Sequence, residues 1–422
     1  MIVSEAIVVA FLRASTLLGK FLFTLYLARV LTLSDLGLWT LLLAIVTYGI
    51  FFIGAETYNI VLRNYVRSSR MDSVGRFSKQ WYFFFLQYAI ILLIGSFLML
   101  LDNFKSNLAL IVCCILILEH ASHEFHRLAI FTNKQIHANC ILLIKSTGWM
   151  SIAAYCFYTG IAEVSLQTIV LFWLLGAALS LTYCLWMFSW LPKLLDRSFV
   201  LFPKSKLKNY IIQIAPFYFL SLAIQSPIFL SRYIFEISSN REELAVYGYY
   251  TTFGNGIEAL FGAVVIAKLI PLLLNNDSSL IPEKSKVVAY VKKYLLISLV
   301  FWISSFIVLY LSLPSINAFT QKVVMQDFML IFPIIFAGQM FFSFGAVIQY
   351  GLYALNCDKE LAILAGQYFF LSVILLVFLI PLYGSFGAAL AMCLASLFMF
   401  LGRVRQLFNI WQIKDKSYDR KH

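Results

Sequence analysis

Ionisable side chains gather in the stretch LEHASHEFHRLAIF, residues 118–131, within an otherwise apolar run. Nine positions contain three of the chain's five histidines, two glutamates and an arginine. At 100° per residue, six side chains fall within an arc of about 160° on a helix. They are Glu119, His120, His123, Glu124, His126 and Arg127. The pattern predicts an amphipathic half-helix with one polar face.

Three kinds of chemistry fit this face. Glu119 with His123, and His120 with Glu124, are i,i+4 pairs that can share protons, and histidine titrates near neutral pH. A metal site would use His123, His126 and Glu119, but the spacing HExH differs from HExxH, and only the distant His137 could add a ligand. We therefore expect no metal. A solvated inner wall and a part in proton coupling or substrate contact both stay open.

The composition places this helix in a membrane. The chain has 422 residues, 62% hydrophobic and 12% charged, against roughly half and a quarter in soluble domains. About 20 apolar residues cross a bilayer core of about 30 Å. We predict twelve spans, at 5–31, 35–62, 78–101, 106–131, 136–159, 166–191, 208–234, 244–274, 287–313, 324–355, 361–381 and 385–411.

The distribution of basic residues predicts the orientation. With both termini in the cytoplasm, 23 of the 32 Lys and Arg residues fall in inward loops and the C-terminal tail, against five outside. The net charge of +12 is then mostly topogenic, and it indicates contact with anionic membrane lipids rather than with nucleic acid. The sequence contains no Walker motif, no HExxH motif and no signal for a cofactor.

Three sequence matches between the two halves predict an internal duplication. Arg29 followed by Asp35, Gly37 and Trp39 resembles Arg232 followed by Glu243, Ala245 and Tyr247, while Lys134 and Tyr158 match Lys359 and Tyr383 at one common offset. We predict a six-helix lobe over 1–196, a cytoplasmic linker over 197–207 and a second six-helix lobe over 208–422. Parallel repeats of this kind enclose a central cavity in transporters.

Charged side chains within the spans are candidates for this cavity, because each costs about 2.5–3.5 kcal/mol at mid-membrane. Arg13 and Lys20 are seven residues apart, hence within about 20° on one helical face. Together with Lys145 and Lys268 they appear in the sequence as four unpaired cations. We interpret them as the lining of a water-filled lumen.

The twelve spans, the opening LARVLTLSDLGLWTLLLAIV and the junction HRLAIFTNKQIHANCIL together resemble the Wzx-type polysaccharide flippases of the MOP superfamily. The resemblance implies an all-α polytopic fold with two six-helix lobes around a central cavity, like that of MATE transporters. It also implies movement of an undecaprenyl-diphosphate-linked oligosaccharide, an O-antigen or capsule repeat unit, from the cytoplasmic to the periplasmic leaflet of the bacterial inner membrane. Possible partners are a polysaccharide polymerase and a chain-length regulator.

Within this resemblance we assign roles to ten residues. Substrate binding is assigned to Arg13, Lys20, Lys145, Lys268 and Arg232, because a diphosphate needs cationic donors. Ion coupling is assigned to Glu56, Glu119, His120, His123 and Glu258. No nucleotide motif is present, and an ion gradient supplies about 2.3 kcal/mol per charge per 100 mV. We therefore expect ion-coupled alternating access and no enzyme activity.

Three rival functions remain. A MATE-like multidrug or metabolite antiporter shares the fold, but its cavity would carry acids facing cationic drugs, whereas the first span here is basic. A membrane glycan polymerase needs a long outward loop with catalytic residues, and no outward loop exceeds roughly a dozen residues. A lipid II flippase is disfavoured because that group usually has two further helices.

Overall fold

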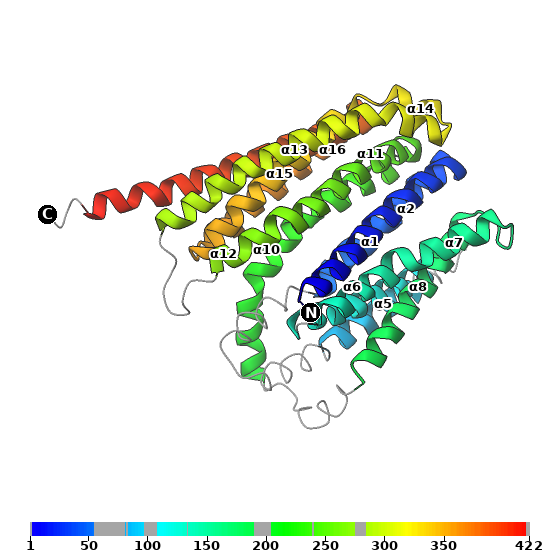
Figure 1. The fold of residues 1–422 in the computed structure, drawn as a ribbon, viewed down its shortest axis with the longest axis horizontal. Helices are drawn as coiled ribbons and strands as arrows, with labels where there is room; N and C mark the ends of the chain where they lie inside the picture. Colours follow the sequence, from blue (N-terminus) through cyan, green and yellow to red (C-terminus); the bar gives the residue numbers. More distant parts are fainter. Residues whose placement is uncertain are drawn as a thin grey trace. The chain divides into compact units, whose positions relative to one another are not determined.

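The computed structural model describes residues 2–54, 81, 83–96, 108–132, 134–189, 204–238, 240–274 and 284–418. In these ranges all regular secondary structure is helical (Figure 1). The first helices are α1 (Ile2–Val30), α2 (Leu33–Gly54), α5 (Leu108–Phe131), α6 (Gln135–Leu143), the π-helical turn η1 (Ile144–Gly148), α7 (Trp149–Tyr158) and α8 (Leu166–Met187). The later ones are α10 (Lys204–Ile237), α11 (Arg241–Phe261), the π-turn η2 (Gly262–Ile266), α12 (Ala267–Leu274), α13 (Lys284–Thr320), α14 (Val323–Asp327), α15 (Ile331–Ala354) and α16 (Asp358–Tyr418).

These helices match the predicted spans. Nine helices in the described ranges are long and apolar enough to cross a membrane by length and composition. The last covers Asp358–Ile410 and holds two predicted spans, because Gly384 adopts φ 55° and ψ −132° and breaks the helix. A shorter apolar helix, Phe83–Ser96, and α10 lie at two further predicted positions. The prediction of an all-α fold with many apolar, membrane-length helices is confirmed for the described residues.

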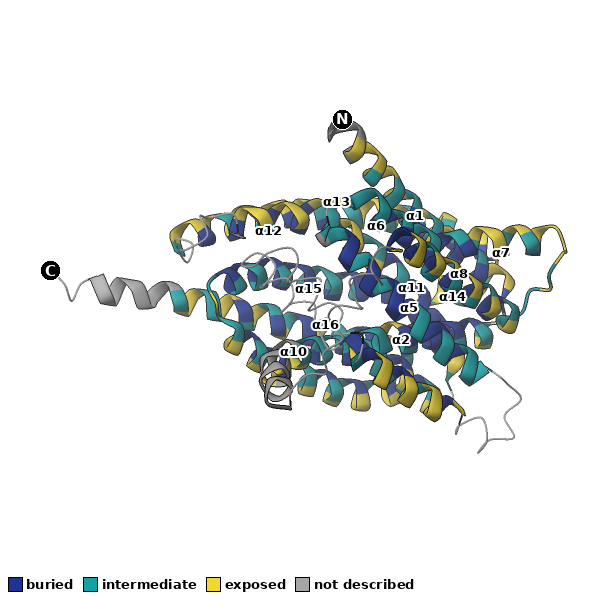
Figure 2. Cartoon of the chain, turned by 90° about the horizontal axis from the view of Figure 1, so that it is seen from below, coloured by how far each residue is buried: buried dark blue, intermediate teal, exposed yellow. Residues whose placement is uncertain are grey.

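Apolar side chains on the helix surfaces indicate contact with lipid. On α13, Leu296, Val308 and Leu311 are 65%, 67% and 74% exposed. Figure 2 shows exposed residues along the lengths of helices as well as at their ends. In a bilayer such side chains lie against acyl chains, and the helical backbone satisfies its own hydrogen bonds.

The chain forms two compact units. Unit 1 comprises Met1–Leu31 and Leu42–Leu222, and unit 2 comprises Thr32–Leu41 and Ala223–His422. The beginning of α2 belongs to unit 2 because its small residues meet α11 closely: a Cβ placed on Gly37 would lie 2.1 Å from the carbonyl oxygen of Arg241. The predicted linker at 197–207 falls mostly outside the described residues, so the division into lobes at that point stays a prediction.

Asp35 and Glu243, the two acids matched in the predicted repeat, both take part in capping the N-terminus of a helix. Asp35 donates its backbone N–H to Thr32 Oγ1 at 3.1 Å, and its carboxylate accepts from the same hydroxyl at 2.8 Å. Glu243 donates its N–H to Asn240 Oδ1 at 3.3 Å and accepts from Asn240 Nδ2 at 2.9 Å. Each acid is the third helical residue of a reciprocal N-terminal cap. The sequence match therefore marks the start of α2 and of α11.

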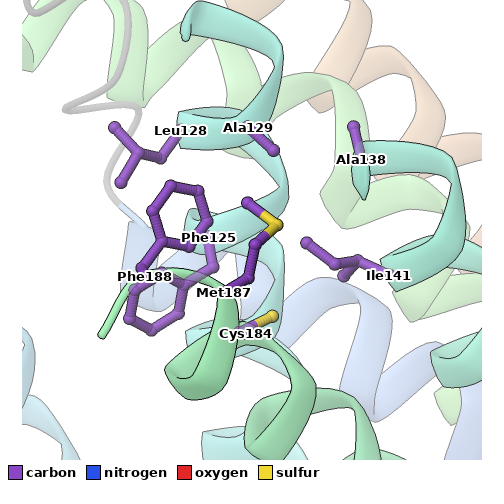
Figure 3. Packing of buried hydrophobic residues seen from close by; sticks show 8 residues of the cluster. All are labelled: Phe125, Leu128, Ala129, Ala138, Ile141, Cys184, Met187 and Phe188. Carbon is purple, nitrogen blue, oxygen red and sulfur yellow. The ribbon is translucent and has the colours of Figure 1, made fainter. Parts of the chain in front are cut away.

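In unit 1, an apolar core holds α5, α6 and α8 together (Figure 3). Its members are Phe125, Leu128, Ala129, Ala138, Ile141, Cys184, Met187 and Phe188. Small residues at this contact let the helices approach closely. The packing fixes the rotation of α5, so that its polar side chains face defined neighbours.

Candidate functional site

A buried ion pair joins α5 to η1. Lys145 Nζ lies 2.6 Å from Glu119 Oε2, and it also donates to the backbone oxygen of Glu119 at 3.2 Å. The other carboxylate oxygen, Oε1, accepts from the indole N–H of Trp173 on α8 at 2.9 Å. Glu119 and Lys145 are 5% and 9% exposed. The prediction of an unpaired cation at Lys145 is therefore wrong, because a residue from another helix neutralises it.

The π-helical turn positions Lys145. A π-turn inserts one extra residue into a helix and changes the direction of the side chains around it. The carbonyl oxygen of Lys145 accepts from the indole N–H of Trp149 at 3.0 Å, which satisfies one backbone group. Thr147 Oγ1 donates to the carbonyl oxygen of Thr16 on α1 at 3.0 Å. The turn is thereby fixed against α1 as well.

Helix α1 adds two further cations: Lys20 interacts with the ion pair itself, and Arg13 is linked to it through His126, which interacts electrostatically with both Arg13 and Lys145. Arg13 Nε donates to Asn139 Oδ1 on α6 at 3.0 Å. Lys20 is exposed and interacts electrostatically with both Lys145 and Glu119. The structure thus collects residues from α1, α5, η1 and α8. We call Arg13, Lys20, Glu119, Lys145 and Trp173 the Lys145 cluster.

The histidines of α5 do not share one environment. His120 is fully buried; its Nδ1 lies 2.6 Å from the hydroxyl of Tyr88, and its ring packs edge-on against Phe84. Its Nε2 is 4.0 Å from Glu124 Oε1, which accepts from Arg127 at 2.9 Å. The predicted single polar face is therefore divided, and His120 faces the helix that contains Phe84 and Tyr88.

His123 and His126 stack with ring centroids 6.1 Å apart, and His126 interacts electrostatically with Arg13 and Lys145. The described residues include no group of three or more His, Cys, Asp or Glu side chains placed to hold a metal ion. Glu119 uses both of its oxygens on Lys145 and Trp173. Glu119 therefore bonds to side chains of two other elements, and the predicted i,i+4 contact between Glu119 and His123 is not formed.

Three further predicted site residues do not belong to the Lys145 cluster. Arg232 on α10 is 8% exposed; it donates to the carbonyl oxygen of Ile228 at 2.6 Å and its guanidinium lies 5.9 Å from the ring centre of Tyr247. Lys268 on α12 is exposed and Glu258 on α11 is half-buried. All three belong to unit 2. Glu56 lies outside the described residues.

Sequence reasoning missed two residues. Trp173 carries no signal of its own, because an indole in an apolar span resembles an ordinary core residue. Arg403 on α16 was counted among the basic residues that set the topology, yet it is 2% exposed. Within the described part of the chain, its Nε has no hydrogen-bond partner and no carboxylate forms an ion pair with it. Its burial distinguishes Arg403 from Arg405, two residues later, which is exposed.

Comparisons with solved structures identify the fold. No protein-family model matches the chain. No curated protein sequence matches it either. Among solved structures, the lipid II flippase MurJ in an inward closed conformation matches with a TM-score of 0.70 and 18% identity, over 96% of this chain and 87% of that one.

Two further structures agree. An inward-facing MATE-family multidrug resistance transporter of the MOP superfamily matches with a TM-score of 0.71 and 12% identity, over 98% of this chain and 99% of that one. A MOP-superfamily transporter from Pyrococcus furiosus matches with a TM-score of 0.54 and 11% identity, over 95% of both chains. The chain therefore has the fold of MOP-superfamily transporters.

Proposed function

We propose that this protein is a flippase that moves an undecaprenyl-diphosphate-linked oligosaccharide, an O-antigen or capsule repeat unit, to the periplasmic leaflet. It would work in the bacterial inner membrane, with both termini in the cytoplasm, by ion-coupled alternating access. The fold supports a secondary transporter or flippase rather than an enzyme. Membrane lipids, a polymerase and a chain-length regulator are its proposed partners.

One observation carries the choice of an anionic lipid: the Lys145 cluster holds three cations, Arg13, Lys20 and Lys145, and one carboxylate, Glu119. Excess positive charge at membrane depth suits a diphosphate, because ammonium and guanidinium groups form strong charge-assisted hydrogen bonds with phosphate oxygens. A cationic drug would be repelled. Lys268 and Arg232 stay further predicted binding residues, and Glu56, Glu119, His120, His123 and Glu258 stay proposed ion-coupling residues.

Complementation of a flippase deletion tests this function. Arg13→Ala and Lys20→Ala should abolish surface polysaccharide at an unchanged protein level, whereas Lys20→Arg should retain part of it because the charge remains. Arg405→Ala is the matched control, since Arg405 is exposed and lies outside the cluster. Normal surface polysaccharide in both alanine variants would contradict the proposal.

A MATE-like antiporter is the second candidate, favoured by the fold match over nearly the whole chain. Resistance to cationic drugs separates the two functions. The flippase proposal expects no change in drug resistance when the protein is overproduced and restored polysaccharide when it complements the deletion. Raised drug resistance on overproduction, together with no restored polysaccharide, would establish the antiporter.

A further inference from the structure

Glu119 occupies the Lys145 cluster as an anionic ligand would. Both of its carboxylate oxygens are engaged, Oε2 by the ammonium of Lys145 at 2.6 Å and Oε1 by the indole N–H of Trp173 at 2.9 Å. These donors come from two different elements, η1 and α8. The ammonium directed at this carboxylate would suit a phosphate oxygen equally well, whereas the indole N–H holds the carboxylate itself.

Among the described residues, Glu119 is the one acid that forms an ion pair with Lys145. Helix α1 contributes Lys20, the turn η1 contributes Lys145, and His123 follows one helical turn later on α5. Helix α8 carries no Asp, Glu, Lys, Arg or His. Lys20 is exposed, whereas Lys145 is not. An entering anion would thus meet Lys20 first, and at Lys145 it would compete with Glu119 for the same ammonium.

We propose that the diphosphate of the lipid substrate displaces Glu119 from Lys145 and that the released carboxylate takes up a proton from water. This inference rests on the function proposed above. A carboxylate that loses its ammonium partner in a low-dielectric interior is strongly destabilised as an anion, and protonation removes that cost. Binding of the lipid head group and binding of one proton therefore favour each other.

Exchange of Glu119 for the diphosphate would keep Lys145 neutralised both in the empty protein and in the protein loaded with lipid. In the empty protein Glu119 neutralises Lys145, so that no bare buried ammonium remains. In the loaded protein the diphosphate neutralises the same ammonium and Glu119 is uncharged. Because the head group carries more negative charge than one proton cancels, a membrane potential that is negative inside still favours its outward movement. Trp173 is a positioning residue that holds the carboxylate in the empty state.

Binding of a short-chain diphosphate diester tests the exchange. The purified full-length protein is titrated with farnesyl-diphospho-N-acetylglucosamine between pH 5.5 and 8, a range in which both phosphates of this probe stay ionised. The wild type should bind more tightly as the pH falls, by up to about tenfold per pH unit, which is the linkage of one proton. Glu119→Gln should bind at least as tightly as the wild type at pH 8, with a much smaller pH dependence. Glu163→Gln, at an exposed acid between α7 and α8, should behave like the wild type.

Two further variants separate folding from exchange. Trp173→Phe loosens Glu119 without removing it, so it should raise the affinity and keep the pH dependence. Lys145→Met should lower the affinity at every pH. A Glu119→Gln protein with the wild-type pH dependence, or with weaker binding throughout, would overturn the exchange alone. A folded wild type that does not bind the probe would overturn the proposed function, and the exchange with it.

Discussion

Trp173 donates its indole N–H to Glu119 across 54 residues of sequence, at 2.9 Å. This bond holds the carboxylate oxygen that Lys145 leaves free. A charged acceptor in a buried place makes the bond stronger than one between neutral groups. The ion pair of α5 and η1 therefore depends on a third helix, α8.

Trp173→Phe should lower the free energy of unfolding by about 1.5–3 kcal/mol, because it removes a hydrogen bond to a charged group. Thermal unfolding in detergent measures the loss. Trp302→Phe is the control, since Trp302 is also buried but its indole N–H has no hydrogen-bond partner among the residues that the structure describes. Equal losses in the two variants would mean that ring packing, and not the N–H, accounts for the effect.

Lys145→Met should destabilise the protein by about 3–5 kcal/mol, because it leaves the buried carboxylate of Glu119 without its counter-charge. The double variant Lys145→Met with Glu119→Gln should recover part of that loss, since no unpaired charge remains. A double-mutant cycle from thermal unfolding gives the coupling. Strictly additive losses would show that the 2.6 Å pair contributes nothing to stability.

Gly37→Ala should cost about 1–3 kcal/mol, because the new methyl group would meet the backbone of Arg241, which cannot rotate away. Gly256→Ala provides the comparison, since nothing lies within 4 Å of a Cβ at that position and alanine is the better helix former. Unfolding temperatures should fall for the first variant and hold or rise for the second. The reverse order would contradict the close packing of α2 on α11.

Arg403→Met should raise the free energy of unfolding by about 1–3 kcal/mol, because a long apolar side chain replaces a buried guanidinium that forms no ion pair with any described residue. Gly345 leaves room for this guanidinium, since a Cβ there would lie 2.9 Å from NH1. Arg405→Met should change little, because Arg405 is exposed. A clear fall in the unfolding temperature of the Arg403 variant would reveal an anionic partner for the guanidinium.

Much of the architecture was predictable from the sequence. Apolar runs of about 20 residues specify helical spans because a bilayer offers the backbone no other hydrogen-bond partners. The acids Asp35 and Glu243 mark helix starts for an equally local reason, since each bonds to a residue only three positions earlier. The sequence also grouped Arg13, Lys20, Lys145 and Lys268 as lining cations, because charges in spans avoid lipid; Lys20 and Lys145 do interact electrostatically, whereas the shared lining stays a prediction.

Tertiary structure alone decided how those charges are used. Helical periodicity places Glu119 and His120 on one broad face, but the rotation of α5 against its neighbours sends Glu119 to Lys145 and His120 to Tyr88. The pairing also needs the π-turn, which no periodic pattern predicts because it interrupts the period. Arg403 shows the same limit: basic character is a property of the residue, whereas burial depends on which helices surround it.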